Sequence, residues 1–255
     1  MPMKRTLLGT AIAATVLLSG VATAQAAPVK NIILVHGAWV DGSGWKPVYE
    51  ILRKDGYQVT LVQEPLTSFD ADVAATQRVI DLQQGPVILV AHSYGGSVIT
   101  QAGNDSKVAG LVYIAAHEPD AGENEAANGK AYPTALSRAQ AIEKTPDGFT
   151  YLDPARFPAL FAADMPLAQA SFEAHSQILT SAKVFAAPIT DPAWRHKPSW
   201  ALVAGSDNII SPDLERMYAK RANSHVVEVP GASHSVYETH PKDVAALIEQ
   251  AARGV

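Results

Sequence analysis

The chain contains no cysteine. This absence excludes disulfides, thiolate catalysis, iron–sulfur clusters and cysteine-based zinc sites. Basic residues are fewer than acidic ones, with 20 Lys and Arg against 25 Asp and Glu, and they form no stripe along the sequence. Nucleic acid is therefore not an expected partner. No H-E-x-x-H, EF-hand or P-loop pattern occurs, and we expect neither a metal nor an organic cofactor.

Long apolar runs are missing after Ala27, so nothing in that part of the sequence is expected to span a bilayer. The residues before Ala27 have a different pattern. Lys4 and Arg5 precede an apolar run over 6–21, and Ala24-Gln25-Ala26 follows it. A basic start, an apolar run and a small-x-small site are typical of a secretory signal peptide. Residues 1–26 are therefore predicted to be removed, which leaves a periplasmic or secreted protein with no stable membrane anchor; a retained anchor is the alternative.

Short β-rich runs alternate with helical stretches along much of the chain. The runs cover 31–36, 57–62, 87–91, 108–115, 199–204 and 225–229. Several are almost continuously apolar, as in strands buried on both faces of a parallel sheet. The alternation predicts an α/β fold with a mostly parallel six-stranded sheet and helices on both faces.

The middle of the chain has another character. Residues 117–197 are rich in Pro, Ala and loop signals, with helical patterns over 134–143 and 166–179 and no convincing strand. We expect a helical cap insertion there, carried by a core formed by residues 27–116 and 198–255. An insertion after the fourth strand lies at the carboxyl ends of the strands, where open α/β sheets bind ligands.

The strongest chemical signal is the segment Ala91-His92-Ser93-Tyr94-Gly95, between a predicted strand and a predicted helix. A serine on such a tight turn projects its hydroxyl above the sheet, and small residues two before and two after it let strand and helix backbones approach. Ala91 stands where glycine is usual. Ser93 is the predicted nucleophile; the alternative is a helix N-cap.

A serine hydroxyl needs a base. His234, in the loop 231–235 between the last strand and the last helix, is the predicted base. His240 is the rival, although its place before Pro241 is more typical of a surface residue at a helix start.

The imidazole in turn needs an acid that fixes its tautomer. Asp207 follows the fifth strand and lies between the serine and the histidine in sequence, so it is the predicted acid. Asp213 is more easily interpreted as a charge in the first turn of a helix. Glu118 and Asp120, after the fourth strand, are the alternative acid position.

An oxyanion needs two donors. We predict the backbone N–H of Tyr94, directly after the nucleophile, and that of Ala38 in the loop 36–39 after the first strand. Trp39, Phe161 and Met165 are candidates for an apolar substrate pocket, although packing within the insertion explains the last two as well.

These motifs together resemble the α/β-hydrolase superfamily. The opening stretch through Trp45 and Leu52 is similar to the small branch of methylesterases and hydroxynitrile lyases, with its bacterial secreted esterases. The resemblance implies a helical cap and cofactor-free acyl chemistry. Our hypothesis is a serine esterase that cleaves small-molecule carboxylic esters through an acyl-enzyme.

Two other interpretations stay open. The first is different chemistry on the same residues: lactone or amide hydrolysis, perhydrolysis, or cyanohydrin cleavage. A lyase of this branch would place a lysine near the pocket, and Lys183 and Lys197 are the candidates. The second is a catalytically silent ligand-binding protein. The oligomeric state is not predicted.

Overall fold

The computed structural model describes residues 1–3 and 27–255. The predicted signal peptide, residues 1–26, lies almost entirely outside the described residues. Within the described ranges no helix is long and apolar enough to cross a membrane.

A six-stranded parallel sheet forms the centre of the molecule. Its strand order is β2-β1-β3-β4-β8-β9, and every neighbouring pair is parallel. The predicted fold class is thus confirmed. The strands are β1 (Asn31–Val35), β2 (Gln58–Leu61), β3 (Val87–Ser93), β4 (Val108–Ala116), β8 (Ser199–Ala204) and β9 (His225–Val229). Every residue of β1, β3 and β8 is buried, which explains why these runs are continuously apolar rather than alternating.

Helices cover both faces of the sheet, and a hydrophobic cluster lies under each layer. The apolar faces of these helices pack against the sheet. Typical residues mark where several of them begin: the side chain of Ser68 caps the helix that starts at Phe69 by accepting from the N–H of Ala71, and the last two long helices begin with Pro212 and Pro241. The core helices are α1 (Lys46–Lys54) with α9 (Val236–Thr239) and α10 (Pro241–Gly254) on one face, α2 (Phe69–Asp81) and α3 (Gly95–Ala102) on the other, and α8 (Pro212–Arg221) beside β8. The short 3-10 helix η1 (Gly42–Trp45) precedes α1.

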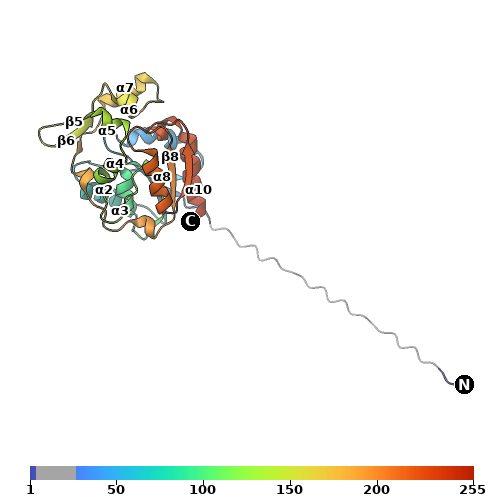
Figure 1. Ribbon diagram of the computed structural model, residues 1–255. Helices are drawn as coiled ribbons and strands as arrows, with labels where there is room; N and C mark the ends of the chain where they lie inside the picture. Colours follow the sequence, from blue (N-terminus) through green and yellow to red (C-terminus); the bar gives the residue numbers. More distant parts are fainter. Residues whose placement is uncertain (4–26) are drawn as a thin grey trace.

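The segment between β4 and β8 forms the insertion, much of which projects at one end of the molecule (Figure 1). Its elements are α4 (Glu125–Ala131), α5 (Ala135–Ala139), β5 (Ile142–Lys144), β6 (Phe149–Leu152), α6 (Phe157–Leu160), α7 (Leu167–His175), β7 (Thr180–Ser181), η2 (Val184–Ala186) and η3 (Ala193–Arg195).

The expectation that the insertion lacks strands was wrong. Strands β5, β6 and β7 form a small antiparallel sheet. They have only three, four and two residues, too few for a period-two pattern to stand out. The helix predicted over 134–143 also ends early, at Ala139, because Gln140 takes a left-handed conformation with φ 51°.

Trp39 joins the insertion to the core. Its backbone N–H donates to Thr180 Oγ1 at 3.0 Å and its indole Nε1 donates to Thr150 Oγ1 at 3.1 Å. The carbonyl of Trp39 accepts from Ile178 N at 3.2 Å. The small sheet of the insertion is therefore fastened to the loop that follows β1.

Candidate active site

Ser93 lies at the junction of β3 and α3 in a left-handed conformation, with φ 54°. Such a conformation is uncommon for a residue other than glycine and is typical of a strained turn at a functional site. The turn requires glycine at position 95, because a Cβ there would lie 2.5 Å from the carbonyl oxygen of His36. Ser93 is buried except for its face toward a cavity.

His234 connects the three residues predicted to act together. Its Nε2 is 2.8 Å from Ser93 Oγ, and its Nδ1 is 2.6 Å from Asp207 Oδ2. The side chains of His234 and Asp207 are fully buried. When Nδ1–H donates its hydrogen bond to the carboxylate, Nε2 carries the lone pair that can accept the hydroxyl proton of Ser93.

The carboxylate of Asp207 is held on both oxygens. Oδ1 accepts from the N–H groups of Ile209 and Ile210, at 2.7 and 3.0 Å, while Oδ2 faces His234. A second carboxyl, that of Glu215, is buried nearby and accepts from Ala204 N. Burial and the charge of Asp207 raise the pKa of Glu215 well above its usual value, which favours the neutral form of Glu215 beside the acid.

The ring of His234 is enclosed by two other rings. Phe161 meets it edge-on with centroids 4.7 Å apart, and the His92 ring lies at 4.5 Å. Burial, aided by His234, lowers the pKa of His92 well below its usual value, and its Nε2–H donates to the carbonyl of His234 at 2.9 Å. His92 is thus a neutral support for the loop that carries His234.

The loop after β1 approaches the serine very closely. A Cβ on Gly37 would lie 2.7 Å from the Cβ of Ser93, so only glycine permits this spacing. The imidazole of His36 holds the loop, with Nδ1 donating to Gly37 O and Nε2 accepting from Glu64 N, both at 2.9 Å. Burial lowers the pKa of His36, consistent with this neutral form.

Ala38 and Tyr94, the predicted oxyanion donors, line the same cavity as Ser93. The phenol of Tyr94 is anchored by donating to Asp72 Oδ2 at 2.7 Å, and Asp72 Oδ1 accepts from Leu66 N. Both predicted donors thus belong to segments that hydrogen bonds hold in place beside Ser93.

The cavity beside Ser93 has a volume of about 340 Å³. Trp39 lines it as predicted, whereas Phe161 and Met165 do not: both are buried, and Phe161 packs on His234 instead. An apolar residue of an insertion can face either the cavity or the insertion's own interior. Phe161 and Met165 pack in the interior. The apolar walls that sequence reasoning missed are Leu136, Ile142, Phe185, Ile209, Ile210 and Leu214.

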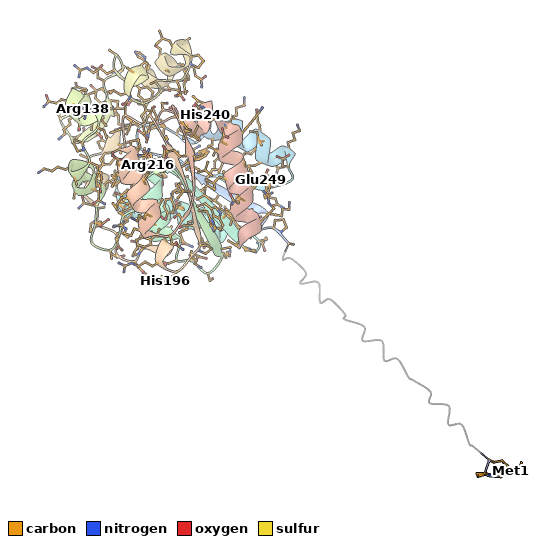
Figure 2. The ribbon with its side chains drawn as sticks, turned by 45° about the vertical axis from the view of Figure 1, so that its right-hand side comes forward. Met1, Arg138, His196, Arg216, His240 and Glu249 are labelled. Atoms are coloured by element: carbon orange, nitrogen blue, oxygen red, sulfur yellow. The ribbon has the colours of Figure 1, made fainter. Side chains whose placement is uncertain are left out.

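The rival base lies elsewhere. His240 is at the start of α10, on the surface (Figure 2), and its Nδ1 is 2.9 Å from Thr239 Oγ1. His196, also labelled in Figure 2, lies at the end of the molecule opposite α6 and α7.

The alternative acids also have other partners. Asp213 pairs with Arg216 at 2.7 Å on the surface, and Asp120 pairs with Arg195 at 2.5 Å. Glu118 is buried, and the guanidinium of Arg221 opposes the rise in its pKa that burial causes. Asp207 is the carboxylate that the structure brings to His234.

Lys183 and Lys197, the lysines that a lyase would require, do not line the cavity; Lys144, at its exposed edge, does. Among residues 1–3 and 27–255, no group of three or more His, Cys, Asp or Glu side chains is placed to hold a metal ion.

The chain belongs to the α/β-hydrolase family, whose model matches residues 32–247. The similar proteins with solved structures include esterases of the branch that the sequence resembles. A pyrethroid hydrolase from Sphingobium faniae is 22% identical with a TM-score of 0.73, over 88% of this chain and 97% of that one. Methylesterase MES16 from Arabidopsis is 17% identical with a TM-score of 0.75, over 89% and 100%.

One curated relative is closer in sequence over a shorter stretch. It is a carbendazim-hydrolyzing esterase from Nocardioides sp., 34% identical over 108 residues, which are 37% of this chain and 45% of the relative. The match therefore spans less than half the length of that protein.

Proposed function

We propose that this protein is a serine hydrolase that cleaves small carboxylic esters through an acyl-enzyme. The observation that carries the proposal is the continuous pair of contacts from Ser93 Oγ to His234 Nε2, at 2.8 Å, and from His234 Nδ1 to Asp207, at 2.6 Å. A base within hydrogen-bond reach of a serine, and itself oriented by a carboxylate, is the arrangement that activates a hydroxyl.

The reaction has two halves. Ser93 Oγ attacks the ester carbonyl carbon and passes its proton to His234 Nε2, and the oxyanion accepts hydrogen bonds from the N–H groups of Ala38 and Tyr94. The carbon–oxygen bond then breaks, and His234 returns the proton to the leaving alcohol. Water, deprotonated by His234, attacks the acyl-enzyme and releases the acid and free Ser93. Asp207 stabilises the imidazolium in both halves.

The comparisons support ester chemistry, because the curated relative and several proteins of similar fold are named as esterases. The cavity supports a small substrate, since about 340 Å³ with largely apolar walls suits a short acyl or alcohol group.

A panel of p-nitrophenyl esters of increasing acyl length tests the proposal. We expect turnover of at least the short members, with an acyl adduct on Ser93 detectable by mass spectrometry after rapid acid quench. Ser93→Ala should abolish both, while the matched control Ser106→Ala, at an exposed serine, should abolish neither. Full turnover by Ser93→Ala would refute the mechanism.

We also propose that residues 1–26 direct export to the periplasm or medium, and that residues 117–197 cap the core formed by 27–116 and 198–255. The order of basic, apolar and small residues supports the first part. Export with an N-terminus at Ala27, measured on the protein purified from the periplasm or medium, is the expected result; a cell-associated chain that retains residues 1–26 would contradict it.

A further inference from the structure

Among the polar side chains that line the cavity, one neighbouring pair has no part in the proposed mechanism. His117 follows β4, and Glu125 begins α4 in the insertion; both line the cavity together with Ser93. Most of the remaining walls are apolar, so this pair is a local polar surface close to the reacting serine.

The strand–turn–helix segment that carries Ser93 also hydrogen-bonds to both residues of this pair. The N–H of His117 donates to the carbonyl of Ser93 at 3.1 Å. The hydroxyl of Ser97, one turn along α3, donates to Glu125 Oε1 at 2.5 Å. A substrate group bound by the pair would therefore lie at a set distance from the ester carbonyl attacked by Ser93.

Both groups have hydrogen-bonding capacity left over. Glu125 Oε2 lies 3.5 Å from His117 Nε2, and His117 Nδ1 lies 3.4 Å from the hydroxyl of Tyr218. These separations exceed the usual 2.7–3.2 Å of such hydrogen bonds. The side chains are only 12% and 6% exposed for His117 and Glu125, so bulk water satisfies them poorly, and a substrate group in the cavity would serve both.

Burial favours the uncharged forms of both side chains at neutral pH. Burial raises the pKa of Glu125 to about 8, although the bond from Ser97 opposes this rise. Burial, aided by His234, lowers the pKa of His117 to about 3. The 3.5 Å contact therefore joins a carboxylic acid and a neutral imidazole, which offer a donor and an acceptor without a net charge.

We propose that His117 and Glu125 determine substrate specificity by binding an uncharged group that both donates and accepts hydrogen bonds, such as an amide, in the acyl or alcohol part of the ester. This inference rests on the proposed ester hydrolysis. A carboxylic acid next to an imidazole matches the paired donor and acceptor of an amide, whereas an ammonium group would find no opposite charge on this pair.

The test uses p-nitrophenyl heptanoate, a matched ester with an amide in the outer part of its acyl chain, and a third ester that ends in a trimethylammonium group. We expect the wild-type kcat/KM to be highest for the amide ester. Glu125→Leu should lower the ratio of amide to heptanoate kcat/KM by about tenfold, the usual effect of losing one hydrogen bond to a buried group. Glu125→Gln should restore most of that ratio, because an amide side chain also donates and accepts.

Two further variants complete the design. His117→Leu removes the other polar group and should lower the same ratio, which keeps the test valid if Glu125→Leu folds poorly. Glu143→Gln neutralises an exposed carboxylate of the insertion outside the cavity and should leave the ratio unchanged.

Wild-type ratios in both Leu variants, or a preference for the trimethylammonium ester, would overturn the inference while leaving ester hydrolysis intact. Failure of the wild-type protein to hydrolyse any of the three esters would instead contradict the proposed function, and with it the inference.

Discussion

The core and the insertion differ in how they place side chains. In the core, Ser93 ends β3, while Asp207 and His234 follow β8 and β9, so one parallel sheet presents all three at its carboxyl edge. In the insertion, strands of two to four residues and short helices supply cavity walls such as Leu136 and Phe185. Under the proposed function, the core supplies the reacting groups, and the insertion supplies part of the cavity wall that a substrate would contact.

The separation between the two regions is incomplete. The carbonyl of Phe161 in the insertion accepts from Ser235 N at 3.1 Å, next to His234, and the ring of Phe161 covers the imidazole. Trp39 of the core is fastened to Thr150 and Thr180 of the insertion. The insertion therefore also holds the two core loops that flank Ser93. Substitutions in the core and at its junction with the insertion should show which residues affect the reaction and which affect stability.

The largest effect is expected within the core, from Asp207→Asn. The neutral amide can donate its N–H to Nδ1, which a carboxylate cannot do, so the imidazole loses its required tautomer, and kcat should fall by about 10⁴-fold. Steady-state kinetics on the best ester of the panel measure the effect. Asp213→Asn, at the surface carboxylate paired with Arg216, is the matched control and should stay within about twofold of wild type, the range of a surface change. A loss below tenfold at Asp207 would argue for another acid.

A smaller effect is expected from Gly37→Ala. The added methyl would lie 2.7 Å from the Cβ of Ser93, so the loop must move and shift the N–H of Ala38. Loss of one oxyanion donor costs about 10²–10³-fold in kcat. Steady-state kinetics should show this loss mainly in kcat, and the midpoint of thermal unfolding distinguishes a lost donor from misfolding. An unchanged kcat would mean that the N–H of Ala38 is not an oxyanion donor.

The junction between the two regions should be sensitive to Thr150→Val. This change leaves the buried Nε1 of Trp39 without its acceptor and the carbonyl of Thr180 without the hydroxyl that donates to it at 2.8 Å. The free energy of unfolding should fall by about 1–3 kcal/mol, measured by urea denaturation. Thr67→Val, at an exposed threonine of the core, is the control; equal effects of both changes would mean that the junction adds nothing.

A gradual effect, spread over several pH units, is expected from the pH dependence of stability at Glu118, where the insertion begins. Burial raises its pKa to about 8 from a usual value of about 4.5. The folded state therefore holds a proton that the unfolded state loses, so the contribution of Glu118 to stability is fully present below pH 4.5 and declines as the pH rises toward 8. One such group contributes at most about 1.4 kcal/mol per pH unit. Glu118→Gln should make the decline shallower in urea titrations between pH 5 and 8; an unchanged slope would show that Glu118 is ionised in the folded protein.

The core was predictable from sequence for a physical reason. Its strands are buried on both faces and therefore read as apolar runs, and the residues just after them, Ser93, Asp207 and His234, inherit positions from the sheet. The structure brings these three together in the predicted chain order. Their catalytic roles remain predictions.

The insertion was less predictable because its order depends on tertiary contacts. The strands β5 to β7 are too short for a pattern. The apolar character of Phe161 and Met165 does not reveal whether they face the cavity or the interior of the insertion, where the structure places them. His117 and Glu125 carried no motif either: a histidine and a glutamate eight residues apart meet only because α4 folds back over the end of β4.

The central claim is that the core activates Ser93 through His234. Labelling of the mature protein with a fluorophosphonate, followed by peptide mass spectrometry, tests it most directly because the reagent requires no knowledge of the natural substrate. The account predicts an adduct on Ser93 in the wild-type protein and its loss in His234→Ala. Folded wild-type protein that acquires no adduct at Ser93, or an adduct that persists at full rate in His234→Ala, would contradict it.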